Sequence, residues 1–229
     1  MSRVLVISDL HFPAVHRDYL GFVKSIKRKW RTNTTIFIGD IADSHAISFH
    51  AKHPELQGAV QEYEETMSHL STWYKAFKNA LVCIGNHDER VHRMAADRGI
   101  PQMYLRDYAE VYKTPSWNWG YQHEIDGILY THGTGTSGLN PAFNSAKGRL
   151  QSCVQGHHHS LATISWIAGP TTRLFGMCVG SGVDKNHKAN MMFDEGATNA
   201  GLSKIFGYNK DVNKKNVMSW IHDFPELGA

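Results

Sequence analysis

The sequence predicts an α/β fold: a βαβαβ core that continues into mixed sheets and carries flanking helices. Three observations support this prediction. Short apolar runs rich in β-branched residues recur along the chain, helical segments separate the first three runs, and the later runs follow at shorter intervals with fewer helices. The chain has 229 residues, enough to bury one sizeable core, so we expect a single domain over residues 1–229.

The first half of the chain contains the βαβαβ pattern. Three buried strands are expected at residues 4–7, 35–38 and 81–84. The helical segment between the first two strands has an apolar face formed by Tyr19, Val23, Ile26 and Trp30. The alternation of buried strands with helices predicts a sheet with crossover helices.

A longer helix is expected between the second and third strands. Its apolar residues alternate steps of four and three over about six turns of ~3.6 residues. They are Leu56, Val60, Tyr63, Met67, Leu70, Tyr74 and Phe77. We interpret them as a stripe that faces the core, in preference to a seam for a partner helix.

The second half is expected to be mixed or antiparallel, because its connections are shorter. Strands are predicted at residues 128–130, 152–154, 164–167, 174–179 and 217–221. Asn140 and Pro141 fit the N-cap and first position of a helix that reaches Leu150. Residues 183–216 are polar and fit a loop, a substrate-facing cap or an oligomer contact, and the oligomeric state stays open.

Composition narrows the class of protein. A content of 41% hydrophobic and 20% charged residues is that of a globular chain, and a net charge of +3 does not by itself argue for nucleic acid. No apolar run reaches membrane-spanning length, so we expect no membrane contact. Cys83, Cys153 and Cys178 are widely spaced within apolar runs, which indicates buried thiols in a reducing compartment, and we expect a cytoplasmic protein.

Residues that can bind metal follow five of the predicted strands. They are Asp9 and His11, then Asp40 and Asp43, then Asn86, His87 and Asp88, then His132, and finally His157 and His159. Ligands of open α/β sheets bind at the carboxyl ends of strands, and neighbouring strands lie only ~5 Å apart. Glycines precede Asp40, Asn86 and His157, where sharp strand exits need unusual backbone angles.

Ligand chemistry indicates which ions would bind. Aspartate and histidine together suit Mn, Fe, Ni or Zn, whereas sites made only of oxygen suit Mg or Ca. Two ions at a separation of ~3.5–4 Å need a bridging ligand, and a carboxylate is the natural one. We therefore expect two divalent ions, with Mn favoured.

The ordered set of motifs resembles the calcineurin-like metallophosphoesterase superfamily. The motifs are Asp-x-His at Asp9, Gly-Asp-x-x-Asp at Asp40, Gly-Asn-His-Asp at Asn86, a lone histidine at His132, and Gly-His-x-His at His157. The resemblance covers about the first four-fifths of the chain. It implies a core of mixed sheets packed as a sandwich.

The resemblance also implies a role for each motif residue. The first ion would be held by Asp9, His11, Asp40 and His159. Asp40 would bridge to the second ion, which is completed by Asn86, His132 and His157. His87 would stabilise or protonate the leaving oxygen, with Asp88 to orient it. A hydroxide activated by both ions would attack phosphorus directly.

Residues near these motifs have less specific signals. Asp43 fits a role in tying down the loops around the ions, and His45 is a candidate to face the substrate. Arg90 lies near enough to His87 in the sequence to contact phosphate. A solvated helix face is nevertheless the default interpretation for Arg90, Arg93, Arg98 and Arg106.

The substrate is expected to be a phosphate ester. Compact size and the aromatic stretch at residues 116–121 mildly favour a diester such as a nucleotide or nucleic acid, although core packing is the favoured interpretation of that stretch. The alternatives are a phosphomonoesterase of the protein-phosphatase kind and a non-catalytic scaffold that binds proteins.

Overall fold

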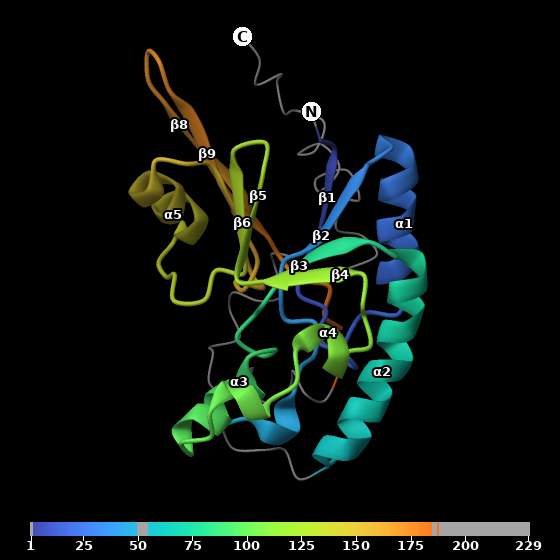
Figure 1. Ribbon diagram of the computed structural model, residues 1–229. Helices are drawn as coiled ribbons and strands as arrows, with labels where there is room; N and C mark the ends of the chain where they lie inside the picture. The colour runs from blue at the N-terminus through green and yellow to red at the C-terminus, as the bar shows by residue number, and fades with distance from the viewer. Residues whose placement is uncertain (1, 50–54, 185–186, 188–229) are drawn as a thin grey trace.

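The computed structural model describes residues 2–49, 55–184 and 187. It confirms the α/β class: two β-sheets lie against each other, with helices on both outer sides (Figure 1). The strand predicted at 217–221 and nearly all of the polar 183–216 stretch lie outside the described residues.

The first sheet consists of four parallel strands in the order β1–β2–β3–β4. They are Val4–Ile7, Thr34–Phe37, Ala80–Cys83 and Trp117–Gly120. The first three occur within one residue of their predicted positions. The fourth was not predicted, and it shows that the aromatic stretch is core, because Trp117 is buried and Trp119 stacks on Tyr112.

Helices α1 (Tyr19–Trp30) and α2 (Ala59–Ala76) connect these strands and cover one face of the sheet (Figure 1). Successive strands are added in the same direction, so right-handed crossovers place both helices on the same side. Their contact with the sheet is a cluster of large apolar side chains that includes Leu5, Ile7, Val23, Phe37, Leu70, Trp73 and Phe77. Each such buried side chain contributes ~1.5–3 kcal/mol relative to an exposed one.

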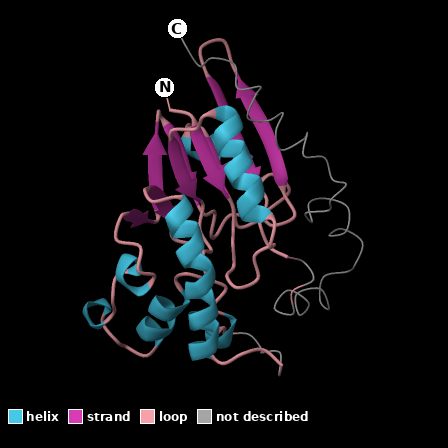
Figure 2. Ribbon diagram, turned by 90° about the vertical axis from the view of Figure 1, so that its right-hand side faces the viewer, coloured by secondary structure: helices cyan, strands magenta, loops and turns pink. Residues whose placement is uncertain are grey.

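The buried face of α2 differs from the predicted stripe in its first half. Leu70 is buried as expected, whereas Val60 is 73% exposed and Tyr63 is 39% exposed. Glu62 and Thr66 take the inward positions instead. The first turns of α2 extend beyond the strands toward the short helices at the strand ends (Figure 2), so their inner face meets polar loops rather than the apolar sheet.

The second sheet is mixed, as predicted, with the order β5–β6–β7–β9–β8. These strands are Gln122–Ile125, Ile128–Thr131, Cys153–Gln155, Arg173–Val179 and Ala162–Ala168. The three central strands are parallel, and β5 and β8 pair antiparallel at the edges. Asp126 and Gly127, both at positive φ, form the two-residue turn between β5 and β6, which suits a type I′ hairpin.

Apolar side chains from both sheets meet in the middle of the molecule and form the sandwich. They are Ile36, Ile38 and Cys83 from the first sheet, and Tyr130, Val154 and Phe175 from the second. Helix α5 (Pro141–Arg149) covers the outer face of the second sheet, where Ala146 contacts Leu129 and Cys153. It begins at Pro141 after Asn140, as predicted.

Four short helices gather near the carboxyl ends of the first sheet's strands (Figure 1), and the sequence indicated only the one that carries Arg90 and Arg93. They are η1 (His45–Ile47), α3 (Arg90–Asp97), η2 (Gln102–Tyr104) and α4 (Tyr108–Val111). All three cysteines are free and buried, as expected. Across the described ranges, no helix combines the length and the apolar character that crossing a membrane requires.

Candidate metal centre

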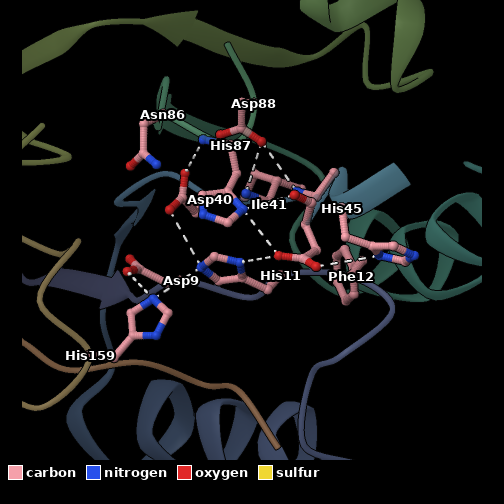
Figure 3. Close-up of polar contacts among 12 residues, drawn as sticks. Asp9, His11, Phe12, Asp40, Ile41, His45, Asn86, His87, Asp88 and His159 are labelled. Carbon is pink, nitrogen blue, oxygen red and sulfur yellow. Dashed lines mark hydrogen bonds and ion pairs between the residues drawn. The ribbon is translucent and has the colours of Figure 1, made fainter. Parts of the chain in front are cut away.

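The loops that follow β1, β2, β3, β6 and β7 bring the predicted metal ligands together. Figure 3 shows five of them, Asp9, His11, Asp40, Asn86 and His159. The first group of potential ligand atoms comes from Asp9, His11, Asp40 and His159, which all lie within 4.8 Å of one another. Nε2 of His11 is 3.0 Å from Nε2 of His159 and 3.4 Å from Oδ2 of Asp40. Nε2 of His159 is 3.3 Å from Oδ2 of Asp9. These nitrogen and oxygen atoms are therefore close enough together to surround one metal ion.

A second group lies beside the first. Asp40, His132 and His157 offer ligand atoms within 4.8 Å of one another. Nε2 of His132 is 3.1 Å from Oδ2 of Asp40 and 3.0 Å from Oδ1 of Asn86. The same oxygen of Asp40 thus faces His11 in the first group and His132 in the second. This is the placement that a bridging carboxylate requires.

The residues present fit a pair of divalent cations. Oδ1 of Asp9 is fully buried and has no hydrogen-bond partner in the described part of the chain, which is costly for a carboxylate oxygen unless a cation is supplied. Two imidazole nitrogens, those of His11 and His159, also face each other with carboxylates around them. Mixed imidazole, carboxylate and amide donors suit transition metals better than Mg or Ca.

Three of the potential ligands have strained backbones. His11, Asp40 and His157 adopt φ values of 46°, 51° and 66°. Residues other than glycine are uncommon in this left-handed region, and such strain of about 1–3 kcal/mol per residue is concentrated at functional sites. The fold therefore accepts a local cost to aim these side chains inward.

The glycines before the motifs serve two different purposes. Gly39 has the positive φ, 108°, that was expected of a sharp strand exit. Gly85 and Gly156 are needed for space instead, because an added Cβ would collide with Oδ1 of Asp40 and with Oδ1 of Asp9 respectively. Loops can approach the carboxylates closely only because these two positions lack side chains.

The charged groups of the centre shift one another's pKa values. Burial opposes ionisation of Asp40, but His132 and His11 hold the pKa of this carboxyl well below its usual value. Burial also disfavours imidazolium, yet the carboxylates raise the pKa of His11 to about 10 and that of His132 to about 9. Burial and the nearby charge of His132 lower the pKa of His157 to about 4. Without ions, the site thus pairs its carboxylates with protonated histidines.

Asp43 lies at the centre of a group of histidines. Its Oδ1 is 2.9 Å from Nδ1 of His11 and 3.0 Å from Nδ1 of His87, whose Nδ1 is also 2.8 Å from the Asp43 carbonyl oxygen. Its Oδ2 is 3.5 Å from Nδ1 of His45. Burial would raise the pKa of Asp43, but these imidazoles, with His11 first, lower it far below its usual value. The carboxylate is therefore ionised and orients two site histidines.

The expected role of Asp88 in orienting His87 is wrong. Oδ1 of Asp88 accepts hydrogen bonds from the backbone amides of Ile41 and Ala42, at 2.9 and 3.2 Å, and Oδ2 accepts one from Gly85 at 3.0 Å. Both oxygens are thus engaged by amides that would otherwise be buried without partners. Asp88 ties the loop after β2 to the turn after β3. Burial, followed by the charge of Asp40, raises its pKa to about 7.

Arg90 does not lie on a solvated helix face. The residue is only 7% exposed, and its Nη1 donates to the Asp43 carbonyl oxygen at 2.6 Å, while Nη2 is 3.2 Å from Nε2 of His87. Arg98 and Arg106 are solvated as expected, with side chains that are 79% and 75% exposed, but they lie outside the helices: Arg98 is the C-cap of α3 and Arg106 precedes α4. Arg90 instead contacts His87, the residue expected to stabilise or protonate the leaving oxygen.

Sequence reasoning missed Glu62, a buried acid on α2. Its carboxylate accepts hydrogen bonds from the backbone amides of His45 and Ala46, at 2.8 and 2.9 Å, and pairs with the His45 side chain. A signal was present in the sequence. Glu62 lies in helical step with Thr66 and Leu70, so an acid shares the inward face of an amphipathic helix.

Comparison with known proteins gives the chain a family. The profile of the calcineurin-like phosphoesterase family matches residues 2–174. Nuclease MPE of Pseudomonas putida is 14% identical, with 81% of this chain and 76% of that chain covered and a TM-score of 0.43. No curated protein sequence matches the chain.

Two further solved structures are similar to this chain to about the same degree. Vacuolar protein sorting 29 from Cryptosporidium parvum is 13% identical, with 79% of this chain and 75% of that chain covered and a TM-score of 0.39. A metallophosphoesterase from Sphaerobacter thermophilus is 16% identical, with 79% and 76% covered and a TM-score of 0.38. These likenesses are distant, and the family assignment rests on the profile.

That profile spans more than half of the 229 residues and includes every residue of the candidate metal centre, from Asp9 to His159. The chain therefore belongs to the calcineurin-like phosphoesterase family.

Proposed function

We propose that this protein is a metal-dependent phosphoesterase that holds two divalent ions and hydrolyses phosphate esters, with a preference for diesters such as nucleotides or nucleic acid. The observation that carries the proposal is the position of Asp40. Its Oδ2 atom lies 3.4 Å from Nε2 of His11 and 3.1 Å from Nε2 of His132, between two groups of potential ligands. A carboxylate oxygen placed between the two groups could serve both ions.

One ion would be held by Asp9, His11, Asp40 and His159, and the other by Asp40, Asn86, His132 and His157. When bound, such a pair of ions polarises the phosphoryl oxygens and lowers the pKa of a water molecule toward neutrality. The donor set favours Mn, with Fe, Ni or Zn as alternatives.

His87 supplies the proton or the positive field for the departing oxygen in this proposal. Asp43 accepts from Nδ1 and so fixes the ring, which leaves Nε2 as the atom directed at a substrate. Burial, then the charge of His11, lowers the pKa of His87, so the neutral ring is favoured and a proton taken up at Nε2 would be readily passed on to the departing oxygen. The guanidinium of Arg90 adds a fixed positive charge beside that nitrogen.

The preference for a diester rests on an exposed aromatic side chain in the segment that follows η1. Phe49 follows η1 and is 53% exposed, with the guanidinium of Arg93 5.5 Å from the centre of its ring. An exposed aromatic ring with an arginine over it is a surface on which a nucleobase can stack. The buried Trp117, by contrast, is not available for stacking.

Hydrolysis assays with chromogenic esters test this function. With Mn added, the purified chain is expected to release p-nitrophenol from bis-p-nitrophenyl phosphate faster than from the monoester, and a chelator should abolish the activity. Faster release from the monoester would support a phosphomonoesterase. Two bound ions without turnover of either ester would instead support a protein-binding scaffold and overturn the proposal.

The compartment is inferred from the cysteines alone. Cys83, Cys153 and Cys178 are free and buried, which is compatible with a reducing environment, and we infer a cytoplasmic location on that ground.

A further inference from the structure

Glu62 is a buried acid that reaches the edge of the metal centre from α2. The residue is 4% exposed, and both of its carboxylate oxygens are occupied. Oε1 accepts from the His45 amide at 2.8 Å, and Oε2 accepts from the Ala46 amide at 2.9 Å. These are the amides at the start of η1, so a negative charge from a separate helix fixes the segment that follows the Asp40 loop.

His45 connects Glu62 to the centre. Its Nδ1 is 2.8 Å from Oε1 of Glu62 and 3.5 Å from Oδ2 of Asp43. Burial alone would lower the pKa of His45, but Asp43 and Glu62 raise it to about 9. The imidazole is thus a cation held between two carboxylates. Figure 3 shows it on the side of the centre away from Asp9 and His159.

Asp43 connects His45 to the histidines of the site. One of its oxygens faces His45, and the other is 2.9 Å from Nδ1 of His11 and 3.0 Å from Nδ1 of His87. The four side chains Glu62, His45, Asp43 and His87 therefore form one continuous chain of polar contacts. It runs from the first turn of α2 to the group placed to protonate the leaving oxygen.

Asp43, His45 and Glu62 also have atoms near enough to one another to be considered as a further metal site. The contacts argue against that. Both oxygens of Glu62 accept backbone amides, and the Nδ1 atom of His45 already faces a carboxylate. An ion there would have to displace the backbone amides from Glu62, whereas the ion pair between His45 and Glu62 leaves those hydrogen bonds in place. Neither ring nitrogen of His45 makes a hydrogen bond of its own within the described residues, so the ring is held by ion pairing alone.

We propose that Glu62 and His45 are positioning residues that act through Asp43 to fix the rings of His87 and His11. This inference rests on the proposed function for its kinetic part only. Buried polar chains of this kind are valuable when complete, because each member restricts the orientation of the next. If the ring of His87 were free to move, turnover would fall, because a displacement of about 1 Å in a catalytic group can lower the rate by ~10²-fold.

The test compares Glu62→Gln with Glu64→Gln on the same helix, where Glu64 is exposed. Glutamine keeps the size of Glu62 and one acceptor oxygen but loses the charge that holds His45. We expect Glu62→Gln to retain both ions and the wild-type KM, while kcat for the chromogenic diester falls about tenfold to hundredfold. Glu64→Gln should match the wild type. An unchanged kcat in a folded, metal-loaded Glu62→Gln protein would overturn the proposal.

Two variants of His45 separate positioning from packing. Asparagine can place its amide N–H near the position of the imidazole Nδ1–H, whereas leucine fills the space without a donor. We expect His45→Asn to recover most of the kcat that His45→Leu loses. Equal losses in the two variants would indicate a packing role and contradict the proposal.

A measurement without metal or substrate keeps the inference independent of esterase activity. In metal-free protein labelled with 15N at histidine, Glu62→Gln should shift the ring-nitrogen resonances of His45, His11 and His87, and Glu64→Gln should leave them in place. Shifts confined to His45 would show that the chain of contacts stops there, which would overturn the inference. If the wild type hydrolyses no ester, this arm still decides whether Glu62 reaches His87.

Discussion

A guanidinium nitrogen of Arg90 lies 3.2 Å from Nε2 of His87. The other ring nitrogen of His87 is held by Asp43, so the imidazole is contacted at both ends. A neutral ring bonded to Asp43 through Nδ1–H has its lone pair on Nε2, and Arg90 donates to that lone pair. The nitrogen proposed to face the substrate is therefore already in contact with a positive charge.

Replacing His87 by asparagine should separate chemistry from metal binding. The ring is not among the proposed ligands, so His87→Asn is expected to bind both ions while kcat falls by ~10²–10⁴-fold, the usual worth of a positioned acid. Elemental analysis and diester kinetics on the same preparation check this. Wild-type turnover in a fully loaded variant would remove His87 from the mechanism.

Arg90 should matter through geometry as well as charge. Arg90→Lys keeps the charge, but one ammonium group cannot reproduce the two contacts to the Asp43 carbonyl and to His87. We expect kcat to fall about tenfold and the free energy of unfolding to fall by ~1.5–3 kcal/mol, the range for hydrogen bonds of charged groups.

Arg98→Lys provides the matched control for Arg90→Lys, because the Arg98 side chain is 79% exposed. It should change neither kcat nor the denaturation midpoint. Equal effects of the two substitutions would mean that the buried contacts of Arg90 have no special role.

Asp40 should be needed by both ions at once. Asp40→Asn removes the charge from the oxygen that faces His11 and His132, so we expect metal content to fall at both sites and diesterase activity to fall by orders of magnitude. Asp97→Asn is the control, since the Asp97 side chain is 63% exposed on α3. Two tightly bound ions per chain in Asp40→Asn would contradict a bridging role.

The sequence predicted where the candidate ligands gather because of one regularity. Buried parallel strands are continuous apolar runs, and the polar residue directly after such a run must lie at the carboxyl end of the sheet. This placed Asp9, Asp40 and Asn86 correctly at one edge of the fold. The order of β1, β2 and β3 in the sheet is the same as their order along the chain. Their arrangement could therefore be predicted without any long-range information.

Side-chain direction within the turns could not be predicted in the same way. Asp88 adjoins His87 in the sequence, yet it turns to three backbone amides, and Asp43 contacts His87 from another loop. Which carboxylate serves which partner depends on amides left unpaired by the folded loops, and these are not visible in a linear pattern. Glu62 was missed for a related reason: the stripe on α2 was judged by apolar residues alone.

Metal affinity should rise with pH through the neutral range. Without ions, the carboxylates raise the pKa of His11 to about 10 and that of His132 to about 9, so both rings are protonated at neutral pH. Metals bind neutral imidazole, and binding must expel these protons. We therefore expect affinity to increase from pH 7 until about pH 9–10 and to level off above both pKa values.

Calorimetry in two buffers with different heats of ionisation measures the protons released on binding. At pH 7.5 the wild type should release more than one proton for each chain loaded with Mn, and His132→Asn should release fewer. Release close to zero would show that the two rings are neutral before the metal arrives.

Gly156 should be intolerant of even one methyl group. The Cβ of an alanine there would overlap Oδ1 of Asp9 and the side chain of Ile38, both of which are fully buried. Overpacking of this kind typically costs ~1–3 kcal/mol, and any relief by movement of Asp9 would weaken metal binding as well. Gly156→Ala is therefore expected to lower both the free energy of unfolding and the affinity for Mn.

Gly148→Ala is the matched control for Gly156→Ala, because nothing lies within 4 Å of a Cβ at this position of α5. Alanine within a helix should stabilise it by ~0.5–1 kcal/mol, with no change in metal binding. Urea unfolding of the metal-free proteins and Mn titration of the folded ones supply the two measurements. If Gly156→Ala unfolds like the wild type and binds Mn with equal affinity, the loop after β7 does not press against Asp9 in the way that the structure requires.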